Sequence, residues 1–201
     1  MEFATLGKTG LKVSRLGAGL YEMGLLADVS AAGRLLSAAL DGGINFLDTA
    51  ACYDNSEEWI GRTISHRRHE YILATKAGHV IGGYQGEEWT PKTITDSIER
   101  SLVRMRTDYL DLVQLHSCDV DILERGEVTQ ALLDARQAGK TRFTGYSGDN
   151  KAALWAIENG QFDTLQITFN LVAQRARRDV LPKAKAKGMG IIAKRPIAND
   201  W

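Results

Sequence analysis

Short apolar runs alternate along the chain with stretches in which apolar residues repeat every three or four positions. The runs begin near residues 15, 45, 71, 109, 141, 164 and 190 and have the length of buried β-strands. Between the third and fourth runs, Ile94, Ile98, Leu102 and Met105 follow one another at the spacing of an amphipathic helix. Because strands that are joined by helices run parallel and are covered on both faces, the pattern predicts an α/β protein.

Capping residues, glycine and proline set the boundaries of these elements. We predict strands at 15–20, 45–50, 71–77, 109–116, 141–147, 164–169 and 190–196. We predict helix starts at Asp28 or Ser30, at Asn55 with Glu58 as its capping-box partner, at Thr90-Pro91, and near 127, 149 and 179.

A hairpin is predicted ahead of the first strand, in residues 2–14 (EFATLGKTGLKVS). Two architectures fit the strands and helices that follow, a (β/α)8 barrel of the TIM type and an open doubly wound sheet. No GxGxxG follows the first strand, which favours the barrel. We count seven strands of the expected eight, and such a barrel typically has roughly 250 residues. We therefore expect one incomplete barrel domain over residues 1–201 that lacks its final β/α unit.

Composition narrows the class of protein. Of the 201 residues, 44% are hydrophobic and 25% are charged, and the formal net charge is zero. This balance gives no general field to recruit nucleic acid or an anionic membrane, and no apolar run approaches the roughly 20 residues of a membrane span. Cys52 and Cys118 form no spaced metal or disulfide framework, which indicates a reducing compartment. We expect a cytoplasmic enzyme or binding domain, with no nucleic acid and no membrane among its partners.

Four polar residues stand at the ends of three successive predicted strands: Asp48, Tyr53, Lys76 and His116. In a parallel barrel these ends meet at one face, where active sites lie. Lys76, in an otherwise apolar strand, needs a partner such as Asp48. A cation beside Tyr53 would lower the pKa of the phenol and make it a proton donor to a carbonyl oxygen that His116 orients. Singly, each residue also fits a structural role, whereas together they indicate a functional constellation.

Other candidates have simpler explanations. His66 and His69 have helical metal-ligand spacing but lie in a charged turn, so we predict no metal site. Cys52 adjoins Tyr53 without an obvious base partner and is interpreted as a small buried residue. The arginines between 175 and 178 are interpreted as a solvated loop, with a phosphate contact as the alternative.

The chain resembles the aldo-keto reductase family. The matching segments occur in family order and cover nearly the whole sequence. They are LGKTGLKVSRLGAG, GINFLDTAACYDNSEEWIG, ATKAG, SLVRMRTDYLDLVQLH, GKTRFTGYSG and the stretch from LQITFN through KGMGIIAKRP.

The resemblance implies a barrel whose bottom is closed by the N-terminal hairpin. It implies reduction of small aldehydes or ketones by NAD(P)H, and we favour NADP(H) over NAD(H). The residues that fall on the family's catalytic tetrad are Asp48, Tyr53, Lys76 and His116. Tyr53 would be the general acid, Lys76 and Asp48 its tuning pair, and His116 the group that orients the carbonyl.

Five positions concern the cofactor. Ser147 and Gln166 fall where the family holds the nicotinamide carboxamide. Gly148 replaces the asparagine that usually follows the serine, and Lys194 replaces an aromatic that usually stacks on the nicotinamide. The flat guanidinium of Arg195 is a candidate to stack in its place.

Three aromatic residues, Tyr21, Tyr84 and Trp89, are candidate walls of the substrate pocket, with plain packing as the alternative. A different functional class also fits, namely a barrel that binds a nucleotide or a partner without turnover. An unclosed barrel would leave strand edges exposed, so self-association through them is a further expectation.

Overall fold

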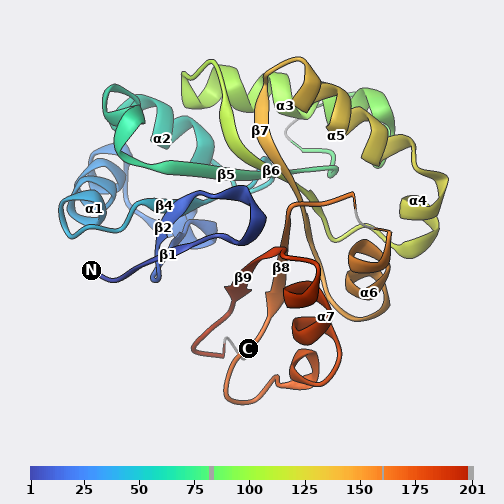
Figure 1. Cartoon of the computed structure of the whole chain (residues 1–201). Helices are drawn as coiled ribbons and strands as arrows, with labels where there is room; N and C mark the ends of the chain where they lie inside the picture. The colour runs from blue at the N-terminus through green and yellow to red at the C-terminus, as the bar shows by residue number, and fades with distance from the viewer. Residues whose placement is uncertain (82–83, 160, 199–201) are drawn as a thin grey trace.

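The computed structural model describes residues 1–81, 84–159 and 161–198 and shows a curved parallel sheet with helices around its outer side (Figure 1). In the described part of the chain, seven parallel strands follow one another across the sheet in sequence order. The strands are β3 (Ala18–Gly19), β4 (Phe46–Asp48), β5 (Ile72–Ala77), β6 (Leu110–His116), β7 (Thr141–Ser147), β8 (Thr164–Thr168) and β9 (Gly190–Lys194). The helices are α1 (Val29–Asp41), α2 (Ser56–Thr63), α3 (Pro91–Met105), α4 (Val120–Arg125), α5 (Glu127–Gln137), α6 (Asn150–Glu158) and α7 (Val180–Ala186). The predicted barrel-like α/β architecture with seven strands is confirmed.

Several strands are shorter than the sequence predicts. The strand predicted at 15–20 is regular only over β3, and the one predicted at 45–50 only over β4. Pairing continues past the regular ladder, since the backbone N–H of Leu20 donates to the carbonyl of Asp48 (2.9 Å). The prediction missed α4, because a helix of six residues is too short to show a periodic apolar pattern.

The helix starts predicted at Asp28, Asn55 and Thr90 are confirmed, and side chains cap two of the three. The Asp28 carboxylate accepts from Ala31 N at 2.8 Å, and the Thr90 hydroxyl accepts from Thr93 N at 3.2 Å. No capping box forms at α2, because Asn55 makes no side-chain cap. Its expected partner Glu58 instead pairs along the helix with an arginine one turn later.

The N-terminal hairpin closes one end of the barrel. Its strands are β1 (Phe3–Thr5) and β2 (Lys12–Ser14), joined by the 3-10 turn η1 (Gly7–Thr9). The turn packs against the start of β9, where Lys8 N donates to the carbonyl of Gly188 (2.6 Å). A Cβ on Gly7 would lie 2.3 Å from Gly190 N, so a side chain does not fit there. Apolar side chains of the hairpin and the strand interiors form a separate core cluster of Leu6, Leu11, Val13, Phe46, Ala74 and Leu112.

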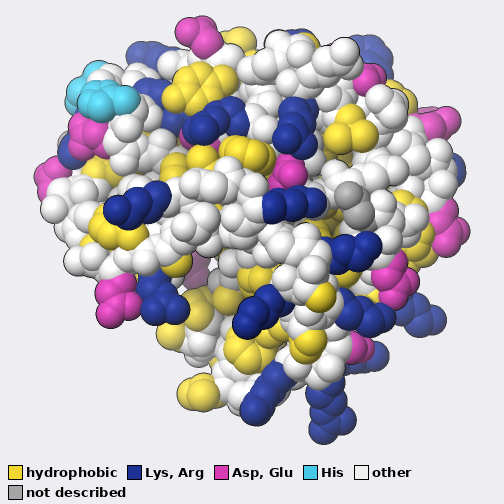
Figure 2. Space-filling model, viewed as in Figure 1, with side chains coloured by type: hydrophobic (Ala, Val, Ile, Leu, Met, Phe, Trp, Pro, Cys, Tyr) yellow, Lys and Arg dark blue, Asp and Glu magenta, His cyan; other side chains and the backbone are white. Residues whose placement is uncertain are grey.

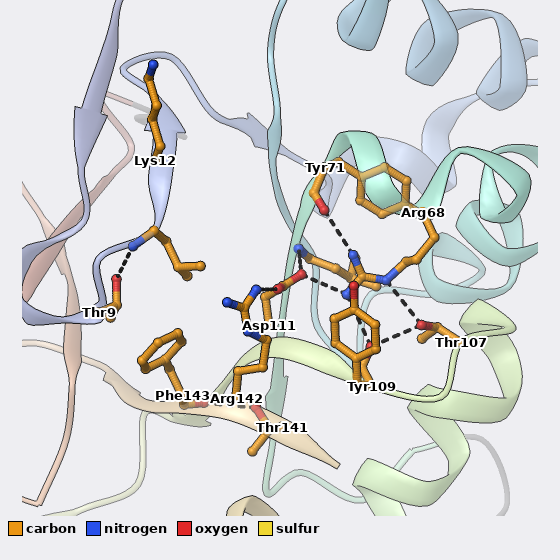
Figure 3. Close-up of polar contacts among 12 residues, drawn as sticks. Thr9, Lys12, Arg68, Tyr71, Thr107, Tyr109, Asp111, Thr141, Arg142 and Phe143 are labelled. Atoms are coloured by element: carbon orange, nitrogen blue, oxygen red, sulfur yellow. Dashed lines mark hydrogen bonds and ion pairs between the residues drawn. The ribbon is translucent and has the colours of Figure 1, made fainter. Parts of the chain in front are cut away.

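One buried carboxylate binds partners on several neighbouring elements near the starts of the strands (Figure 3). Asp111, near the beginning of β6, is only 2% exposed and forms ion pairs of 2.7 Å with both Arg68 and Arg142. It also accepts from the backbone N–H of Leu73 at 2.9 Å. Because these partners lie on η3 (Ser65–Glu70), β5 and β7, one side chain ties four elements together.

The surface carries mixed charge. On the face drawn in Figure 2, Lys and Arg side chains are scattered among acidic and apolar ones. None of the described helices combines the length and the apolar composition that a membrane span requires.

Candidate active site

A buried ion pair joins the carboxyl ends of β4 and β5. Lys76 is 2% exposed, and its Nζ donates to Asp48 Oδ2 at 2.9 Å and to the Thr49 carbonyl at 2.8 Å. Burial alone would lower the pKa of Lys76, but the charge of Asp48, together with Tyr53, outweighs it and raises the pKa. Lys76 is therefore a fixed cation at this end of the barrel, as its sequence context predicted.

Tyr53 lies against that cation. Lys76 Nζ is 4.8 Å from the centre of the Tyr53 ring, a cation–π distance. The rings of Tyr21 and His116 meet Tyr53 edge-on at 5.1 and 5.8 Å between centroids. The structure thus brings together all four residues that the sequence singled out.

The predicted direction of the Tyr53 pKa is wrong. Burial raises the pKa of the phenol, and the positive charge of Lys76 opposes this without overcoming it. The sequence reasoning considered the neighbouring charge but could not measure how deeply the ring is packed. In this structure Tyr53 is therefore held as the protonated phenol at neutral pH.

His116, at the end of β6, is held as a neutral imidazole. Burial, together with the positive charge of Lys76 and further basic neighbours, lowers its pKa to about 3. Its Nδ1 lies 3.4 Å from Cys52 Sγ. Its ring also meets the ring of His79 edge-on at 5.1 Å. Cys52 is half-buried and has a histidine partner, which the sequence interpretation did not foresee.

Ser147 and Gln166 lie in the same interior but differ in their bonding. Ser147 Oγ is buried and has no hydrogen-bond partner among the described residues. Gln166 is already engaged, because its Nε2 donates to Asp48 Oδ2 (2.8 Å) and its Oε1 accepts from Gln114 Nε2 (3.2 Å). A polar chain therefore runs from β6 through β8 to the ion pair on β4 and β5.

Beside this interior, at the ends of β8 and β9, lies a groove of about 310 Å³. Arg195 is exposed on its wall, and its Nη1 donates to Thr168 Oγ1 at 3.4 Å. The residues that line the groove include three basic side chains, Lys151, Arg175 and Arg195, and two acidic ones, Asp149 and Asp179.

The three aromatic residues predicted as walls of the substrate pocket have different surroundings. Tyr21 is 69% exposed beside Tyr53, and Trp89 packs edge-on against His79 at 5.1 Å. Tyr84 instead faces α3, where its hydroxyl donates to Asp96 at 2.6 Å and Arg100 lies over its ring. Tyr84 is therefore a packing residue against α3, the alternative given for it from the sequence.

Sequence reasoning missed the polar partners Gln114 and His79. Gln114 precedes His116 by two residues on one strand, so the two side chains share a face, and this periodicity could have found it. His79 lies in a loop with no periodic pattern, and its Nδ1 is 3.2 Å from Glu88 Oε1. No signal in the sequence pointed to it. Across the described ranges, no group of three His, Cys, Asp or Glu residues is arranged to hold a metal ion.

Comparison with known proteins decides the family. The sequence pattern described as the aldo/keto reductase family matches residues 15–201. This chain belongs to the aldo/keto reductase family.

Relatives of this aldo/keto reductase chain include enzymes and solved structures. The uncharacterized oxidoreductase YqkF of Bacillus subtilis (strain 168) is 32% identical, over 96% of this chain and 64% of its own length. L-galactose dehydrogenase of Arabidopsis thaliana is 30% identical, over 98% of this chain and 66% of its own length. The crystal structure of PA4992 from Pseudomonas aeruginosa, assigned to the aldo-keto reductases, superimposes with a TM-score of 0.88 at 34% identity. That match covers 98% of this chain and 79% of the other. The chain thus spans just under two thirds of the length of these two curated relatives.

Two departures from the expected family pattern have a structural explanation. A Cβ on Gly148 would lie 2.4 Å from the hydroxyl oxygen of Tyr146, so the tyrosine fills the space that an asparagine would need. Lys194 is turned to Asp149 at 3.4 Å, and that carboxylate also accepts from Thr168 N at 2.9 Å. Asp149 therefore bonds to β8 and the lysine, and its side chain does not cap α6, which begins at Asn150 beside the predicted start.

Proposed function

We propose that this aldo/keto reductase domain reduces small aldehydes or ketones to alcohols with a reduced nicotinamide dinucleotide, and that Tyr53 is the general acid. The observation that carries the proposal is the position of Tyr53, whose ring centre is 4.8 Å from a lysine that is itself bound to Asp48. A phenol beside a buried, fixed cation is an arrangement suited to giving up a proton.

Each of the four side chains has a separate role in protonating the carbonyl oxygen. The raised pKa of Tyr53 keeps its proton in place until the carbonyl oxygen gains charge. As the proton leaves, the phenolate forms next to Lys76, whose charge favours it. Asp48 holds that lysine in place. His116, neutral because its pKa is about 3, donates an N–H to the same oxygen without adding a further cation.

The residues present fit a nicotinamide dinucleotide. The bound cofactor would supply the hydride to the carbonyl carbon. Ser147 Oγ, buried and without a partner among the described residues, is a hydroxyl available for a carboxamide, and Gln166 Nε2 has a second N–H beyond the one given to Asp48. Arg195 and the other basic side chains of the neighbouring groove offer positive charge to phosphates. We favour NADP(H) over NAD(H), and the stacking of Arg195 on the nicotinamide stays a prediction.

The test is oxidation of NADPH and of NADH with a panel of aldehydes and ketones. Tyr53→Phe removes the phenolic proton, and we expect it to lower kcat/KM by at least about 100-fold, the usual size of acid catalysis. Tyr109→Phe is the matched control, because Tyr109 lies against Arg68 at the other end of β6. Equal turnover by wild type and Tyr53→Phe would show that Tyr53 is not the acid.

Binding of a nucleotide without turnover is the alternative function. Fluorescence titration with NADPH distinguishes it, because binding without oxidation of NADPH would support it.

Self-association is a further proposal, supported by the sheet: in the described part of the chain β3 and β9 each pair on one side only. Sedimentation over a range of concentrations tests it. We expect a cytoplasmic protein, since both cysteines are unpaired in the structure.

A further inference from the structure

Cys52 and His116 come from different parts of the barrel rim. Cys52 lies in the turn after β4, and His116 ends β6, two strands away. Their side chains nevertheless meet, with Cys52 Sγ 3.4 Å from His116 Nδ1, a hydrogen-bond distance for sulfur. The contact therefore joins the Tyr53 turn directly to the residue that would orient the carbonyl.

A neutral imidazole carries its single proton on either Nδ1 or Nε2, and the partner of one nitrogen decides the state of the other. In the described part of the structure, Cys52 is the one hydrogen-bond partner of the His116 ring. Its other close neighbours, Tyr53 and His79, meet it edge-on through their rings. The choice of tautomer at His116 therefore depends on the thiol.

We propose that Cys52 is a positioning residue whose S–H donates to His116 Nδ1 and thereby places the imidazole proton on Nε2, ready for the carbonyl oxygen. The catalytic consequence rests on the proposed function, whereas the tautomer itself does not.

The surroundings of Cys52 keep the thiol a donor. Burial raises its pKa, although the positive charge of Lys76 opposes the shift. A thiolate would accept a proton from Nδ1 instead and would leave Nε2 as an acceptor, which cannot donate to a carbonyl. The protonated thiol is thus the state that suits carbonyl reduction.

The test is nitrogen-15 NMR of the histidine side chains in the full chain without substrate or cofactor. His116→Gln identifies the signals of His116 by their loss. In wild type we expect the proton on Nε2. In Cys52→Ala we expect a mixture of tautomers, and Cys52→Ser, which restores an O–H donor, should return the Nε2–H form. Cys118→Ala is the matched control, because that buried thiol makes no hydrogen bond to the His116 ring in the described part of the structure.

Two results would overturn the proposal: a proton on Nδ1 in wild type, or the same Nε2–H form in wild type and Cys52→Ala. If Cys52→Ala unfolds, Cys52→Val, which is slightly larger than cysteine and has no donor, is measured in its place. Kinetics give a second readout. In Cys52→Ala we expect kcat/KM to fall about fivefold, equivalent to about 1 kcal/mol, with rescue in Cys52→Ser. If neither wild type nor any variant turns over a carbonyl, the proposed function fails while the NMR result still decides the role of Cys52.

Discussion

His116 should make the stability of the fold depend on pH between 7 and 5. In the folded chain its pKa is lowered from 6.5 to about 3, chiefly by burial. As the pH falls, the unfolded chain therefore takes up a proton first, and the folded state loses stability relative to it. The contribution is present in full above about pH 6.5 and is lost progressively as the pH falls toward 3. A pH of 5 is about 1.5 units below the pKa of the imidazole in the unfolded chain. At about 1.36 kcal/mol per unit, the folded state therefore loses about 2 kcal/mol of stability.

Urea unfolding at pH 7 and pH 5 measures this loss, compared between wild type and His116→Gln. The glutamine keeps a polar side chain but does not titrate, so its stability should fall by about 2 kcal/mol less over the same interval. Taking the difference between the two proteins removes the contribution of every other titrating group. An equal loss in both would refute the reasoning, because it would mean that His116 is not held neutral by the fold.

Three substitutions test two ion-pair networks and one close packing contact of the fold. Lys76→Met removes the cation from a largely buried carboxylate, Asp48, and should lower the free energy of unfolding by about 3 kcal/mol in urea; an unchanged midpoint would contradict this account of the pair. Asp111→Ala leaves two arginines without their shared acceptor and should cost about 3 kcal/mol in the same assay, whereas a loss below about 1 kcal/mol would show that water replaces the carboxylate. Gly148→Ala forces a methyl group against the Tyr146 ring and should cost about 1–3 kcal/mol by thermal unfolding; wild-type stability would mean that the tyrosine can move aside.

The meeting of Asp48, Lys76 and His116 could be predicted from sequence because parallel strands that are adjacent in the chain are also adjacent in the sheet. Asp48 and His116 end β4 and β6, and Lys76 is the second-last residue of β5; the three strands are hydrogen-bonded neighbours in that order. Side chains at their carboxyl ends therefore meet with no further information than the strand order. The same rule placed Ser147 on the next strand of the same sheet.

The remaining features could not be predicted, because they depend on packing rather than on order. The pKa of Tyr53 rises or falls according to the balance between burial and the charge of Lys76, and only the structure gives the depth of the ring. The contact of Cys52 with His116 skips the intervening strand. Nothing in the sequence indicates which residue of the turn after β4 reaches that far.

Gln166 links two parts of the site through hydrogen bonds. By resemblance it is a cofactor residue, yet in the structure its amide donates to Asp48, the carboxylate that holds Lys76. Its carbonyl accepts from Gln114, so its side chain is oriented before any ligand arrives. A carboxamide that competed for Gln166 would weaken its bond to Asp48, and the carboxylate would then act more strongly on the lysine beside Tyr53. If the proposed function holds, cofactor binding would therefore also change the charge balance beside Tyr53.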